Sequence, residues 1–150
     1  MFINLLFFYF MKIKSQIRLY LDIDGVLLTK RSTKPAEYSN EFIRFIVEHF
    51  DCYWLTTHCK GNLNSTWNYL RTYYSEETMC LLKTIKCTNW QTLKTEAIDF
   101  DIEFIWIEDG PFDSEIKVLK SRNSKHKLFV VNLNRKNELL NLVNKLKFKI

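Results

Sequence analysis

Glycine and proline are scarce in this sequence, with three glycines and two prolines among 150 residues. These residue types are common in turns and flexible linkers, so their scarcity argues against small domains joined by long linkers. No internal repeat or low-complexity segment is found either. From this length and composition, we expect residues 11–150 to form a single domain.

Acidic residues are nearly missing from the C-terminal segment 117–150, which holds ten Lys or Arg residues and a single acid, Glu138. The rest of the chain has a net charge of −4. A basic face beside an acidic body predicts weak contact with phosphate-rich partners such as nucleic acids. The alternative is an ordinary solvated face of the last helix.

The short C-x-x-C spacing of zinc sites is absent. The four cysteines are Cys52, Cys59, Cys80 and Cys87. Their spacing favours buried, reduced thiols over a metal site or a disulfide framework, and this predicts a cytoplasmic protein.

No apolar run is long enough to span a bilayer. The leader at residues 1–10, MFINLLFFYF, is apolar but too short, no charge precedes it, and no small-residue cleavage site follows. We therefore expect no membrane partner. Either translation starts at Met11, or residues 1–10 are a poorly packed appendage.

Apolar runs with strand character alternate with segments of helical periodicity. This order predicts an α/β, Rossmann-like three-layer sandwich, with a mainly parallel sheet and helices on both faces. The expected strands are 17–22, 52–57, 103–109 and 127–132, and the expected helices are 39–50, 65–74, 92–99, 111–122 and 135–147.

Three of the expected strands end in polar side chains: Asp22, Thr56 and Asp109. Ligands of open parallel sheets bind beyond the carboxyl ends of the strands. We therefore expect these three residues to meet in one crevice.

The stretch LYLDIDGVLL, residues 19–28, places Asp22 and Asp24 two positions apart at the end of a buried strand. Two nearby carboxylates repel one another unless a cation or hydrogen bonds compensate. Mg²⁺ prefers oxygen ligands and is the expected cation. A simple Asp24-Gly25 turn is the alternative, but it leaves Asp22 unexplained.

The motif D-I-D-G-V at 22–26 resembles the first motif of the haloacid-dehalogenase-like superfamily. YWLTT at 53–57, Lys94 in LKTEAI, and FIWIEDGPFD at 104–113 resemble the later motifs, in the same order. The resemblance implies a small member of the superfamily without a cap domain. About a dozen residues separate Val26 from the first helix, which leaves no room for an inserted domain there.

The resemblance also implies roles for individual residues. Asp22 would be the nucleophile and form an aspartyl-phosphate, and Asp24 would be the general acid and base. Thr56, or its neighbour Thr57, would hydrogen-bond the phosphoryl oxygens. Lys94 would neutralise negative charge.

The candidate metal ligands are Asp22, Asp24 and Asp109, with the Ile23 carbonyl beside them. The acidic pair of the fourth motif is Glu108-Asp109 rather than two aspartates. Whether Glu108 or Asp113 joins Asp109 at the metal is left open by the sequence, because Asp113 could instead begin a helix.

Asp24 distinguishes between reactions within the superfamily, because dehalogenases that act on carbon lack this second aspartate. The sequence thus predicts a Mg²⁺-dependent phosphatase with an open site, acting through an aspartyl-phosphate on a phosphorylated substrate, either a small molecule or a macromolecule. The alternatives are a non-catalytic phosphate- or nucleic-acid-binding module, and a phosphatase that processes nucleic-acid ends.

Aromatic residues gather in two settings. Trp54 and Trp106 lie inside expected strands and are predicted to be core. Tyr69 and other aromatics of segment 65–74 are expected to border the crevice. His58, directly after the threonines, is either a substrate contact or a loop histidine without a role.

Overall fold

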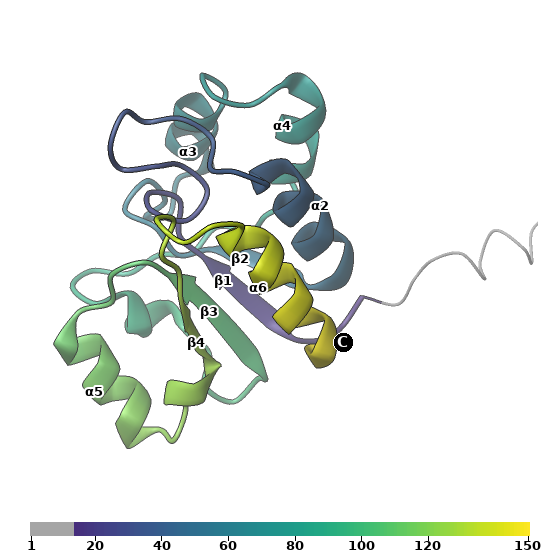
Figure 1. Cartoon of the computed structure of the whole chain (residues 1–150). Coiled ribbons are helices and arrows are strands. Elements are labelled where there is room, and N and C mark those ends of the chain that lie inside the picture. Colours follow the sequence, from purple (N-terminus) through teal and green to yellow (C-terminus); the bar gives the residue numbers. More distant parts are fainter. Residues whose placement is uncertain (1–13) are drawn as a thin grey trace, which may run out of the picture.

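A computed structural model describes residues 14–150, which form a four-stranded sheet flanked by helices (Figure 1). All strand pairs are parallel, and the strand order is β2-β1-β3-β4. The strands are β1 (Arg18–Leu21), β2 (Asp51–Trp54), β3 (Phe104–Glu108) and β4 (Leu128–Val130). The predicted α/β, Rossmann-like parallel sheet is confirmed.

Four of the five predicted helices form, with shifted boundaries. They are α2 (Ser39–His49), α3 (Leu63–Leu70), α4 (Glu76–Leu82), α5 (Asp113–Ser121) and α6 (Glu138–Leu146), with short 3₁₀ turns η1 (Lys94–Ala97), η2 (Lys125–Lys127) and η3 (Lys147–Lys149). The segment predicted as a helix at 92–99 is only the turn η1. Helix α4 was not among the predicted helices; its first turn is capped by the Ser75 side chain.

Both faces of the sheet are covered, and this follows from the alternation of side chains along β1. Leu19 and Leu21 enter the core beneath α2, α4 and α6, whereas Tyr20 enters a second core beneath α5 and η1. Figure 1 shows α2 and α6 on one face and α5 on the other. Trp54 and Trp106 are fully buried, as predicted, in different cores.

Within residues 14–150, no cap domain covers the carboxyl end of the sheet. The connection from β1 to α2 holds only isolated bridges, in which Leu28 pairs with Asp24 and Pro35. The connection from β2 to β3 is taken up by α3, α4 and η1. The absence of a cap was predicted from the short spacing after Val26.

The four cysteines form no disulfide. Across residues 14–150, no helix combines the length and the apolar character needed to cross a bilayer. The predictions about the apolar leader 1–10 and about Met11 lie outside the described residues.

Candidate active site

The carboxyl ends of β1 and β3 carry acidic side chains into one cleft of about 290 Å³. The strand register explains this arrangement, because Leu21 pairs with Trp54 on one side and with Ile107 on the other. The residues that follow these strands therefore lie at one edge of the sheet. The cleft is lined by Asp22, Asp24, Lys30, Thr57, Trp90, Lys94, Glu108, Asp109, Gly110, Phe112 and Glu115.

Lys94 joins two buried acids at the floor of the cleft. Its Nζ lies 3.0 Å from Asp22 Oδ2 and 2.6 Å from Glu108 Oε2. Burial opposes the charge on Lys94, but the two carboxylates outweigh it and raise the pKa of the ammonium group. Lys94 therefore stays protonated and compensates the charge of Asp22, the predicted nucleophile.

The Lys94 backbone is anchored as firmly as its side chain. Its N–H donates to Glu115 Oε1 at 2.8 Å, and Glu115 Oε2 accepts from the N–H of Phe112 at 2.9 Å. Glu115 is almost fully buried. One carboxylate thus ties the start of η1 to the start of α5 and fixes the origin of the Lys94 side chain.

Glu108 is an almost fully buried acid of the cleft. Burial, together with the neighbouring Asp22, raises its pKa, although Lys94 opposes the shift. Its Oε1 accepts the N–H groups of Asp109 and Gly110, at 3.1 and 3.3 Å. These bonds hold the Glu108 carboxylate at the end of β3, beside Asp22.

Asp109 lies at the mouth of the cleft, where its Oδ2 is 2.5 Å from Lys30 Nζ. Gly25 packs against this carboxylate with a positive φ of 81°. The absence of a side chain at Gly25 is what lets the β1–α2 loop approach Asp109 so closely.

Asp24 is held from the other side of the cleft by two side chains. Its Oδ2 lies 2.7 Å from His58 Nε2, and its Oδ1 accepts from the Tyr69 hydroxyl at 2.8 Å. The His58 and Tyr69 rings stack, with centroids 3.9 Å apart. Segments that are remote in sequence therefore fix the orientation of the Asp24 carboxylate.

The two neighbouring threonines have different environments. Thr56 is buried, and its Oγ1 accepts the N–H of His58 at 3.4 Å. Thr57 is exposed and lines the cleft, whereas Thr56 is not among the lining residues. Thr57, the alternative left open by the sequence, is therefore the threonine that lines the cleft.

A possible cation site is formed by one carboxylate oxygen each from Asp22, Glu108 and Asp109, all within 4.8 Å of one another. Carboxylate oxygens suit Mg²⁺, and two of these acids are buried, where a cation would offset their repulsion. The residues present therefore fit Mg²⁺. The remaining predicted ligand, Asp24, is outside this group and instead bonds to His58 and Tyr69.

The other two ligands considered from the sequence, the Ile23 carbonyl and Asp113, have different roles in the structure. The Ile23 carbonyl accepts the N–H groups of Val26, Leu27 and Leu28, at 2.8 to 3.1 Å, so it is used by the turn. Asp113 is exposed in the first turn of α5 and does not line the cleft. Glu108, rather than Asp113, accompanies Asp109 in the acidic group.

Comparison of the chain with models of known families, with characterised proteins and with solved structures finds no match.

Proposed function

We propose that this protein is a Mg²⁺-dependent phosphatase that acts through an aspartyl-phosphate on Asp22. The observation that carries the proposal is the shared cleft of Asp22, Asp24 and Lys94 at the carboxyl edge of a parallel sheet. A buried carboxylate beside a charged lysine suits attack on an anionic phosphate, because the ammonium group offsets the repulsion.

In the first step, an oxygen of Asp22 forms a bond to phosphorus and the bond to the leaving oxygen breaks. Asp24 supplies a proton to that oxygen. Asp24 then takes a proton from water, which attacks phosphorus, so that inorganic phosphate leaves and the Asp22 carboxylate is restored. His58 and Tyr69 keep the Asp24 carboxylate oriented for both transfers.

Electrostatics and hydrogen bonding would be supplied by other residues of the cleft. Lys94 would contact the phosphoryl oxygens as well as Asp22, and Thr57 would donate its hydroxyl to them. Asp22, Glu108 and Asp109 would hold Mg²⁺, which neutralises phosphoryl charge when bound. The open, cap-free cleft suits either a large substrate or a small one.

The decisive experiment measures release of phosphate from p-nitrophenyl phosphate and from a panel of phosphate monoesters, with Mg²⁺ and with EDTA. We expect turnover that requires Mg²⁺ and is lost in Asp22→Asn, which keeps the shape of the side chain. Asp113→Asn is the matched control, because this acid is exposed and does not line the cleft. Circular dichroism would establish that both variants are folded.

Hydroxylamine would test the covalent step directly. It converts an acyl phosphate into a hydroxamate, so peptide mass spectrometry should find that modification at Asp22 after turnover. A folded wild-type protein that is inert across the whole panel would refute the proposal. If such a protein bound single-stranded nucleic acid with steep salt dependence, the basic C-terminal segment would instead favour a binding module.

A further inference from the structure

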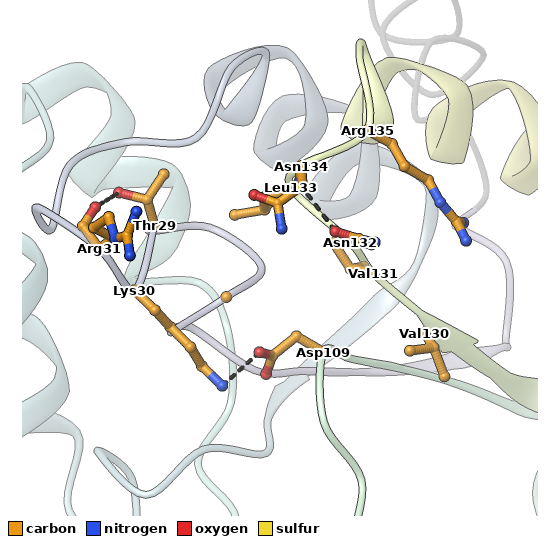
Figure 2. A pocket seen from close by; sticks show the side chains of 11 residues that line it. Thr29, Lys30, Arg31, Asp109, Val130, Val131, Asn132, Leu133, Asn134 and Arg135 are labelled. Carbon is orange, nitrogen blue, oxygen red and sulfur yellow. Dashed lines mark hydrogen bonds and ion pairs between the residues drawn. The ribbon is translucent and has the colours of Figure 1, made fainter.

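A second and larger hollow, of about 870 Å³, adjoins the candidate active site (Figure 2). It shares Gly25, Lys30 and Asp109 with the site described above. Figure 2 shows segment 29–31 on one side, segment 130–135 on the other, and the Lys30–Asp109 ion pair between them. Its volume lies within the range of sites for small organic ligands.

The lining of this hollow is cationic and rich in hydrogen-bonding groups. Asp109 is its single acid among the described residues, and Lys30 already pairs with it. The lining cations are Lys30, Arg31 and Arg135, and the uncharged polar side chains are Thr29, Asn132 and Asn134. Such a set suits an anion, because guanidinium groups bind phosphate oxygens in pairs and amides add hydrogen bonds.

Local hydrogen bonds shape the first wall of the hollow. Thr29 Oγ1 donates to the carbonyls of Arg31 and Lys34 at 3.1 and 3.4 Å, which closes the loop that carries Lys30. Arg31 is exposed on this loop. The loop therefore presents two adjacent cations beside the active site.

The opposite wall is shaped in the same way. Asn132 Oδ1 accepts the N–H of Asn134 at 3.1 Å, and Glu138 Oε1 accepts the N–H of Asn132 at 3.0 Å. Arg135 lies 3.9 Å from Glu138, and its side chain stays 67% exposed. Its charge is therefore only weakly compensated, and its guanidinium remains available to a ligand.

We propose that this hollow binds a second phosphate group of the substrate, so that the preferred substrates are phosphate esters that carry two phosphates. The inference rests on the proposed function, because the first phosphate is the one at Asp22. The Lys30–Asp109 ion pair joins the two sites.

The test compares adenosine 3′,5′-bisphosphate with adenosine 5′-monophosphate in the presence of Mg²⁺. We expect kcat/KM for the bisphosphate to be about tenfold higher, as one or two charge-assisted hydrogen bonds would give. In the double variant Arg31→Gln, Arg135→Gln, the ratio of the two kcat/KM values should fall towards one. Arg44→Gln is the control, since Arg44 is exposed and pairs with Glu77 away from the hollow.

A short single-stranded oligonucleotide with a terminal phosphate separates two sources of the second phosphate. Preference for the oligonucleotide over the monophosphate, lost in the double variant, would support the inference with a nucleic-acid strand as substrate. Preference for the bisphosphate alone would support it with a small molecule. Equal kcat/KM for all three would overturn it.

Binding to the Asp22→Asn variant separates failure of this inference from failure of the proposed function. Calorimetric titration of that variant with each nucleotide requires no turnover. Tighter binding of the bisphosphate that depends on Arg31 and Arg135 would support the second site even if wild type were inert. Turnover of monoesters together with equal binding of both nucleotides would refute the second site alone.

Discussion

Gly25 lies so close to Asp109 that a methyl group at Gly25 would overlap the Asp109 carboxylate. Its positive φ adds a second penalty for any side chain at this position, of about 1–2 kcal/mol. We expect Gly25→Ala to lower the free energy of unfolding by at least that amount and to weaken Mg²⁺ binding, because Asp109 must move. Urea unfolding and calorimetric titration with Mg²⁺ would measure the two effects. Gly110→Ala is the matched control, since a methyl group there meets no atom within 4 Å.

Lys94 is predicted to be essential for stability as well as for chemistry. Both of its carboxylate partners are buried, so Lys94→Met would leave two uncompensated acids and cost about 3–5 kcal/mol. Lys86 offers a control, because its 2.7 Å pair with Asp51 is much more exposed. Lys86→Met should cost about 1 kcal/mol or less. Equal unfolding free energies for the two variants would contradict this account of the cleft.

Tyr69 is predicted to act by positioning Asp24. Burial and the bond to Asp24 raise the pKa of Tyr69, so its hydroxyl stays protonated and donates. Tyr69→Phe should lower kcat on p-nitrophenyl phosphate about tenfold and change KM little, as loss of one hydrogen bond to a charged group suggests. Tyr73→Phe is the control, because the Tyr73 ring contacts the Tyr69 ring edge-on. A fall confined to KM would argue against positioning of Asp24.

The position of the site could be predicted from the sequence because it depends on strands. Short apolar runs ending in Asp22 and Asp109 indicate parallel strands, and parallel strands bring their carboxyl ends together. Lys94 was predicted to belong to the site because it lies between the second and fourth motifs, and the structure places it in the same cleft.

The partners of these residues were beyond prediction because they depend on how loops and helices pack. The sequence gives no signal that Lys30 pairs with Asp109, and Tyr69 could be expected only near the crevice. In the sequence, Glu115 resembles an ordinary acid in the first turn of a helix, but in the structure its Oε1 accepts the backbone N–H of Lys94. Strand β2 is shorter than predicted and ends at Trp54, and the residue after it that lines the cleft is Thr57 rather than Thr56.

The thiols should differ sharply in reactivity if the core beneath α2, α4 and α6 is packed as described. Burial raises the pKa of Cys52 to about 12, and burial together with Cys59 raises that of Cys87 to about 11. A higher thiol pKa means less thiolate at pH 8 and therefore slower alkylation. We expect iodoacetamide to label the exposed Cys80 first, with Cys52 labelled only in urea. Peptide mass spectrometry over time would measure this, and equal rates for Cys52 and Cys80 would contradict the packing.

The two threonines provide the last prediction, because they separate a structural hydroxyl from a functional one. Thr57→Val removes the hydroxyl of the threonine that lines the cleft, so kcat/KM on p-nitrophenyl phosphate should fall about tenfold with little change in stability. Thr56→Val removes the acceptor of the His58 N–H and should cost about 1 kcal/mol of unfolding free energy. Kinetics and urea unfolding of both variants would test the assignment. The reverse pattern, with activity lost only in Thr56→Val, would return the phosphate-binding role to Thr56.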